Sequence, residues 1–149
     1  MKTIYQKIKN ILHITLIIGI FSLMTGCASK SLEAQKANNV DLTALKTMYV
    51  EKLPADERGI EILIATELNK LGYQATYGPK FPADGDFDAL VTYQDKWMWD
   101  ITMYMLELNI QVKNPDTNFI MASGHSHRTS LVRKSKEEMV SEVVGEIFK

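Results

Sequence analysis

The chain has 149 residues, which is enough for one ordinary domain and short for two. Its residues are 46% hydrophobic and 23% charged, a balance that excludes a wholly disordered chain. The formal net charge is -1, and the sequence has no concentrated basic patch of the kind that nucleic-acid-binding proteins carry.

Residues 1–26 have the three-part order of a secretory signal peptide. Lys2, Lys7 and Lys9 give a positively charged start, and an apolar stretch over residues 11–24 follows them. This stretch is about 14 residues long, whereas a membrane-spanning helix needs about 20. A signal that is removed therefore fits the segment better than a permanent transmembrane helix.

The only cysteine follows this apolar stretch, in the segment Leu-Met-Thr-Gly-Cys that ends at Cys27. The segment resembles the lipobox of bacterial lipoproteins, in which an apolar residue, a small residue and glycine precede the cysteine. The resemblance implies that Cys27 carries a diacylglycerol on its thiol and a fatty acyl chain, such as palmitate, on its new amino group. Two acyl chains already anchor a protein stably. With the thiol consumed, no disulfide can form within the chain.

The residues after the cysteine bear on which membrane would hold the protein. In lipoproteins of Gram-negative bacteria, an aspartate directly after the cysteine commonly keeps the protein at the inner membrane. Here Ala28 and Ser29 follow Cys27. The resemblance therefore implies the periplasmic side of the outer membrane, or the inner membrane if this sorting rule does not apply.

The expected organisation has three parts. Residues 1–26 form the signal peptide that is removed. Residues 27–44 form the lipidated cysteine and a flexible tether, because the segment is polar and has no clear period. Residues 45–149 form a single α+β domain of an ordinary size.

A strand-helix-strand unit opens the predicted domain. We expect a strand over 46–52, a helix over 56–71 and a short strand over 73–77. Asp56 can cap the helix, and Gly72 follows its last apolar residue, where a left-handed conformation is common.

Strands dominate the second half of the chain. A loop rich in glycine, proline and aspartate over 78–88 leads to a predicted strand over 89–93. A long strand over 97–113 and another over 119–128 are expected to pair as a hairpin. Ser135 and Glu138 match a capping box for a final helix. The order predicts a two-layer sandwich, with one mainly antiparallel sheet and two helices packed on one face.

Several of these features resemble a group of small, mostly uncharacterised proteobacterial lipoproteins. They are the signal with Cys27, the strand-helix start, Thr92 and Tyr93, the run from Trp97 to Ile101, and Tyr104. More distantly, the layout resembles accessory envelope lipoproteins such as the lipopolysaccharide-assembly lipoprotein. The resemblance implies a non-enzymatic accessory or binding module of the envelope that faces the periplasm. Its motifs are structural and name no chemistry.

The long strand predicts a candidate interaction surface. Leu106, Leu108, Ile110 and Val112 share one face and are expected in the core. The alternate residues of the same strand face the other way. If this alternation continues towards the start of the strand, five large apolar side chains point towards solvent: Trp97, Trp99, Ile101, Met103 and Met105. Such a cluster marks a surface for an envelope protein or a lipid partner.

Two alternatives stay open for this cluster. A bulge or turn near Asp100 would reverse the phase and place Trp97 and Trp99 in the core. Otherwise, the segment over 28–44 or a partner subunit would cover the face.

An envelope metal-binding protein is the alternative function. His125 and His127 point to the same face of one strand, and the loop Asp84–Asp88 carries alternating carboxylates. A zinc site needs three or four ligands, and a calcium loop needs glycine where this chain has Ala89. Solvated polar residues are the simpler interpretation of both patterns, so we predict no metal site.

The sequence favours a protein that is not an enzyme. It has no nucleophile elbow, no His-Glu-x-x-His motif, no phosphate-binding glycine loop and no free thiol. The only predicted cofactor is the covalent lipid on Cys27. The predicted partners are the membrane, through this anchor, and an envelope protein or lipid, with no nucleic acid.

Overall fold

The computed structural model describes residues 29–149, together with the single residue Gln6. The signal predicted for residues 1–26, apart from Gln6, and the lipid site predicted at Cys27 lie outside the described residues. Within the described part, no helix is both long enough and apolar enough to cross a membrane.

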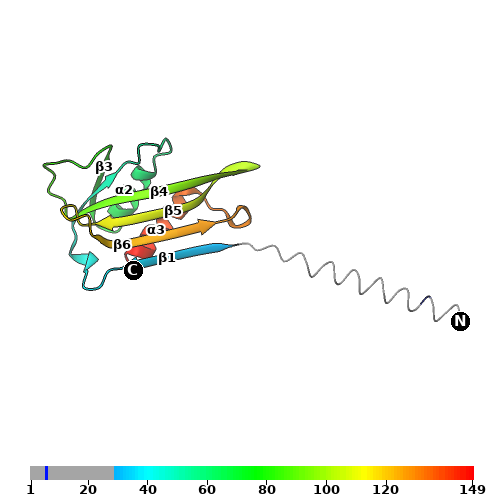
Figure 1. The fold of residues 1–149 in the computed structure, drawn as a ribbon, viewed down its shortest axis with the longest axis horizontal. Helices are drawn as coiled ribbons and strands as arrows, with labels where there is room; N and C mark the ends of the chain where they lie inside the picture. The colour runs from blue at the N-terminus through cyan, green and yellow to red at the C-terminus, as the bar shows by residue number, and fades with distance from the viewer. Residues whose placement is uncertain (1–5, 7–28) are drawn as a thin grey trace.

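One six-stranded sheet forms the first layer of the domain (Figure 1). Its strands are β1 (Lys30–Lys36), β2 (Thr47–Glu51), β3 (Gln74–Gly78), β4 (Ala89–Asp100), β5 (Thr102–Lys113) and β6 (Ile120–Arg128). Their spatial order is β1-β6-β5-β4-β2-β3. The pairs from β4 to β1 are antiparallel, whereas β2 is parallel to both β3 and β4.

Two α-helices, α2 (Ile60–Lys70) and α3 (Lys136–Ile147), form the second layer on one face of the sheet. The structure is therefore the predicted α+β two-layer sandwich. Two short 3-10 helices, η1 (Leu42–Ala44) and η2 (Ser130–Val132), join the larger elements. The predicted hairpin between 97–113 and 119–128 corresponds to the pairing of β5 with β6.

Local sequence signals explain where the helices begin and end. Ser135 and Glu138 form the predicted capping box at the start of α3. Helix α2 begins at Ile60, four residues later than predicted, but the Asp56 carboxylate still accepts a hydrogen bond from the Ile60 N–H at 2.8 Å. Gly72, directly after the helical cap, has the expected left-handed backbone, with φ of 97°.

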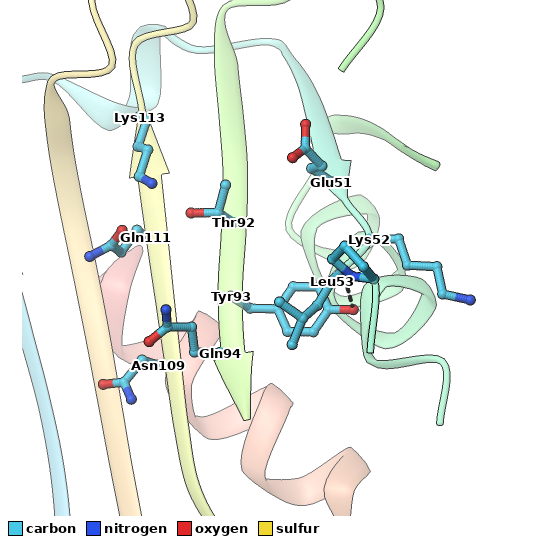
Figure 2. Close-up of a pocket in the computed structure, with 10 residues that line it drawn as sticks. Glu51, Lys52, Leu53, Thr92, Tyr93, Gln94, Asn109, Gln111 and Lys113 are labelled. Atoms are coloured by element: carbon cyan, nitrogen blue, oxygen red, sulfur yellow. Dashed lines mark hydrogen bonds between the residues drawn. The ribbon is translucent and has the colours of Figure 1, made fainter. Parts of the chain in front are cut away.

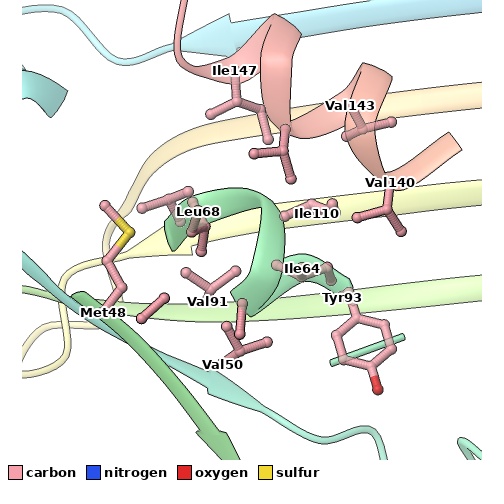
Figure 3. Close-up of a cluster of buried hydrophobic side chains, with 14 of the residues drawn as sticks. Met48, Val50, Ile64, Leu68, Val91, Tyr93, Ile110, Val140, Val143 and Ile147 are labelled. Carbon is pink, nitrogen blue, oxygen red and sulfur yellow. The ribbon is translucent and has the colours of Figure 1, made fainter. Parts of the chain in front are cut away.

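The core lies between the sheet and both helices (Figure 3). Ile64 and Leu68 of α2 and Val140, Val143 and Ile147 of α3 face inward. They pack against sheet residues that include the following: Met48, Val50, Val91 and Ile110. Helix α3 packs close to the sheet at Gly124, where an added Cβ would lie 2.7–2.8 Å from Ile147 and Val143.

The prediction of a flexible tether over 28–44 is wrong. Residues 30–36 form β1, which pairs with β6 along its full length. Leu42 in η1 is fully buried, and Leu32 and Ala34 pack against the core. β1 is an edge strand with one solvated face, so two apolar residues suffice on its inner face. Two apolar residues are too few to give a recognisable alternation of apolar and polar residues in the sequence. The folded domain therefore begins near residue 30.

The prediction of a single long strand over 97–113 is also wrong. Strand β4 continues to Asp100, the chain turns at Ile101, and β5 begins at Thr102. The turn contains none of the glycine, proline or asparagine residues that usually mark a hairpin. The alternative of a turn near Asp100 is confirmed for the turn itself and for Trp97, which packs against the core, but it is wrong for Trp99, which stays exposed.

Candidate functional site

The far end of the β4–β5 hairpin carries a cluster of exposed apolar side chains. We call residues 98–103 the hairpin tip. Trp99 is 69% exposed and Ile101 is 84% exposed, and the tip also exposes Met98 and Met103. Soluble surfaces rarely gather large apolar residues in this way without a partner. The hairpin tip is therefore the main candidate for a binding surface.

The structure keeps only part of the predicted five-residue surface. Trp99, Ile101 and Met103 are exposed, as predicted. Met105 is buried in the core, and Trp97 is half-buried against it, so the prediction is wrong for Met105. The indole N–H of Trp97 donates to the Asp95 carboxylate at 2.5 Å.

A β-bulge decides which face these residues occupy. Lys96 pairs with Glu107, but Trp97 pairs with Met105, so Leu106 has no counterpart in β4. The extra residue reverses the alternation in β5. Trp99 and Met103 therefore lie on the face that the helices cover, beyond the part of that face that the helices reach, whereas Met98, which pairs with Tyr104, lies on the opposite face.

The turn residue has a conformation that its side chain disfavours. Ile101 has φ of 61°, in the left-handed region. A β-branched residue is a genuine outlier there, since the conformation costs about 1–2 kcal/mol for residues with a Cβ. Such strain occurs most often at functional sites. A strained, nearly fully exposed isoleucine is not explained by folding alone.

An open cleft of about 470 Å³ lies behind the hairpin tip. Its floor is apolar and aromatic, and most of its rim is basic. The lining residues are Arg58, Trp97, Met103, Tyr104, Met105, Arg133, Lys134, Ser135, Lys136 and Glu138. They come from β4, β5, the segments that precede α2 and α3, and the first turn of α3. The cleft therefore joins an apolar surface to positive charge.

The basic residues of the cleft are only partly neutralised. Lys134 pairs with Glu142, and Lys136 lies 4.0 Å from Glu137. Within residues 29–149, Arg58 and Arg133 form no ion pair with a carboxylate. The cleft therefore presents uncompensated positive charge.

Two contacts fix the positions of the basic groups. The Arg58 guanidinium lies 4.3 Å from the centre of the Trp97 ring, a cation–π contact. The Lys136 ammonium donates to the backbone oxygen of Arg58 at 2.6 Å. The segment before α2 and the first residue of α3 are thus joined at the rim of the cleft.

The buried carboxylate of Asp56 lies beside Tyr93 of β4. The Tyr93 hydroxyl donates to the Asp56 carboxylate at 2.7 Å. It accepts from the Leu53 N–H at 3.2 Å (Figure 2). Burial raises the pKa of Asp56, but hydrogen bonds from Tyr93 and from the backbone of Arg58 and Ile60 outweigh it and hold this pKa below its usual value. Asp56 therefore stays ionised and fixes the start of α2.

The hydroxyl proton of Tyr93 is held in its hydrogen bond to Asp56, so Tyr93 is not a candidate acid or base for catalysis. Burial and the hydrogen bond to Asp56 raise the pKa of Tyr93 far above its usual value. A second hollow, of about 260 Å³, lies beside this residue and is lined by amide and charged side chains such as Gln94, Asn109 and Gln111 (Figure 2). No lining residue pairs a nucleophile with a base, so the hollow offers no catalytic arrangement that we can name.

The alternative metal ligands do not gather in one place. His125 and His127 share the outer face of β6, opposite Glu33 and Ser31 of β1. Asp88 is engaged elsewhere, because its carboxylate accepts from the N–H groups of Lys46 and Thr47 at 2.7 and 2.8 Å. Among the residues that the structure describes, no group of three or more histidine, cysteine, aspartate or glutamate residues is arranged to hold a metal ion.

Sequence reasoning missed the basic rim of the cleft. Arg58 lies before α2, whereas Arg133, Lys134 and Lys136 lie about 75 residues further on. Their only local signal is a run of basic residues at 133–136, which is common in solvated segments. The meeting of both segments beside Trp97 depends on the tertiary fold.

Comparisons with known proteins support the fold. No family model matches the chain, and no curated protein matches it. Among solved structures, it is similar to the PelC dodecamer from Paraburkholderia phytofirmans, with a TM-score of 0.58 at 10% sequence identity over 80% of this chain and 95% of PelC. A variant of the same dodecamer gives 0.55 at 10% identity, over 79% of this chain and 93% of that one. At this identity the likeness shows a shared fold alone.

Proposed function

We propose that the chain is an outer-membrane lipoprotein that faces the periplasm and acts as a non-enzymatic accessory or binding module of the envelope. The lipid on Cys27 would hold it at the membrane. The hairpin tip and the cleft behind it would form its binding surface. The resemblance to small proteobacterial lipoproteins supports the first statement, and the geometry of the hairpin supports the second.

One observation carries this proposal. The hairpin tip exposes Met98, Trp99, Ile101 and Met103 at a strained turn, where glycine or asparagine would fold with less cost. A surface of this kind is stabilised when a partner removes its apolar side chains from water, by about 25 cal/mol for each Å² of apolar area. Binding explains both the exposure and the strain.

The anchor can be tested on the protein isolated from its native membrane. Mass spectrometry of the mature amino terminus should show a chain that begins at Cys27 and carries a diacylglycerol and a further acyl chain. Density-gradient separation should place this form with the outer membrane. A mature chain that begins elsewhere, or an unmodified Cys27, would contradict the anchor.

The binding surface has its own test. A photo-reactive residue at position 99 should give crosslinked adducts in intact cells. The matched control carries the same residue at position 119, because Phe119 is also exposed but lies at the opposite end of β5. Equal labelling from both positions would argue against the hairpin tip.

A further inference from the structure

We propose that the hairpin tip and the basic cleft bind the surface of an anionic phospholipid bilayer, as a second membrane contact beside the lipid on Cys27. This inference rests on the proposed function and names the occupant of its binding surface. Three observations carry it: where the described chain begins, how far the hairpin tip projects, and how charge is placed behind it.

The described chain begins at the same end of the sheet as the hairpin tip (Figure 1). The backbone oxygen of Ser29 accepts hydrogen bonds from the Thr129 N–H and hydroxyl, both at 3.2 Å. Thr129 leads through η2 to Arg133, which donates from Nη1 to Thr102 Oγ1 at 2.7 Å. A short chain of contacts therefore links Ser29 to the base of the hairpin tip.

Chain geometry limits how far Cys27 can lie from this point. Cys27 lies two positions before Ser29 in the chain, and a fully extended chain spans at most about 3.6 Å per residue. Cys27 therefore lies within about 7 Å of Ser29. A bilayer that holds the acyl chains of Cys27 must pass close to this end of the sheet.

The hairpin tip projects far enough to meet that bilayer. Glu107, His127 and Ser31 lie in one row across β5, β6 and β1. From this row, Ile101 lies five pairing steps further along the β4–β5 hairpin, because Leu106 is the extra residue of the bulge, whereas Ser29 lies two residues further along β1. The tip thus extends about 10 Å beyond Ser29, at about 3.3 Å per residue. It reaches about 3 Å past the limit set for Cys27, so a bilayer that holds the lipid on Cys27 would meet the hairpin tip.

The chemistry of the surface fits a bilayer better than a protein groove. Trp99 supplies the amphipathic ring that is enriched at membrane interfaces. Leu131 in η2 adds another large apolar side chain, 75% exposed, beside the hairpin. Arg58, Lys134 and Lys136 lie behind the apolar tip, at the level where phosphate groups would meet them. Apolar residues at the leading end with basic residues behind them are typical of membrane-surface segments.

The test uses the mature chain without its lipid. Residues 29–149 contain the complete sheet, both helices and the whole core, so the chain from residue 27 onward is a complete folding unit. It is made with Cys27→Ser, and circular dichroism and thermal melting verify its fold. Its sedimentation with vesicles is measured for phosphatidylethanolamine with phosphatidylglycerol and for phosphatidylcholine alone.

Two double variants separate the apolar and basic contributions. Trp99→Ser with Ile101→Ser should reduce binding to the anionic vesicles at least tenfold. The matched control, Phe119→Ser with Ile120→Ser, removes two exposed apolar residues at the other end of β5 and should bind as the parent chain does. Arg58→Gln with Lys136→Gln should reduce binding to anionic vesicles several-fold and leave binding to neutral ones unchanged. Lys46→Gln with Lys113→Gln removes equal charge at the far end and should change neither.

Two results would overturn the inference. One is a parent chain that stays in solution with both kinds of vesicle, which would leave a protein as the occupant of the hairpin tip. The other is an equal loss of binding in the tip variant and its control. Neither result touches the anchor, because the lipid on Cys27 is measured separately by mass spectrometry. An unmodified Cys27 together with vesicle binding would instead remove the anchor and keep the hairpin tip.

Discussion

Arg133 supports the hairpin from the opposite side of the cleft. Its guanidinium donates to Thr102 Oγ1 at 2.7 Å and lies 5.2 Å from the centre of the Tyr104 ring. The same side chain donates from Nε to the backbone oxygen of Ser130 at 2.9 Å. Arg133 thus ties η2 to the first residues of β5, in a stretch of that strand that lies beyond its pairing with β6.

Replacing this arginine should loosen the hairpin without unfolding the domain. In Arg133→Ala, we expect amide hydrogen exchange over residues 98–104 to accelerate about tenfold, because a hydrogen bond from a charged group contributes about 1.5–3 kcal/mol. Exchange in α2 should stay unchanged. Equal protection of residues 98–104 in both chains would show that Arg133 does not support the hairpin.

Replacing Ile101 at the turn should raise the stability of the domain and weaken its binding to vesicles. Ile101→Gly relieves a left-handed conformation that costs about 1–2 kcal/mol and adds back part of this cost as chain entropy. We expect the free energy of unfolding in urea to rise by about 0.5–1 kcal/mol. Vesicle binding should fall, because the most exposed apolar side chain of the hairpin tip is lost. A variant that gains stability and keeps full binding would leave the strain at Ile101 without a function.

The buried tyrosine should matter to stability through its hydroxyl group alone. Tyr93→Phe leaves the ring in place but removes the partner of the Asp56 carboxylate and of the Leu53 N–H. Leaving buried polar groups unpaired costs about 1–3 kcal/mol, and urea unfolding should show this loss. Tyr77→Phe is the matched control, since Tyr77 is about half exposed, and it should change stability little. A loss of similar size in both variants would contradict the role given to the hydroxyl.

The ion pair beneath α3 predicts a dependence of stability on pH. Burial raises the pKa of Glu142, but Lys134 and Arg128 outweigh it and hold this pKa below its usual value. A carboxyl with a lowered pKa in the folded state adds stability above its ordinary pKa of about 4.3, and this stability is lost as pH falls through the folded pKa.

Replacement of this carboxyl tests that dependence. Glu142→Gln should destabilise the chain by about 2 kcal/mol at pH 7, because Arg128 is buried and keeps a weaker partner. The difference in unfolding free energy from the wild type should shrink towards pH 3. A difference that stays constant with pH would show that the Glu142 charge does not contribute.

Elements with strong local signals could be predicted from the sequence. The capping box at Ser135, the left-handed Gly72 and the strand around Tyr49 all lie where the pattern indicates. Each depends on neighbours within a few residues. The start of α2 differs by four residues, because Asp56 reaches the helix from outside it through a turn at Arg58.

The features that form the candidate site depend on long-range structure. The bulge at Leu106 and the turn at Ile101 reverse a strand phase that the sequence alone continues without interruption. β1 gains its order from pairing with β6, about 90 residues further along the chain. The basic residues of the cleft meet because α2 and α3 start beside the same hairpin. None of these placements has a signal within a short window of sequence.

The fluorescence of Trp99 is the most direct measure of whether the hairpin tip enters a membrane. The chain has two tryptophans, so Trp97→Phe leaves Trp99 as the only one. Its emission should shift to the blue when anionic vesicles are added, and lipids brominated near the headgroup end of their acyl chains should quench it. Emission that stays at the wavelength of a solvated indole, without quenching, would contradict the membrane contact.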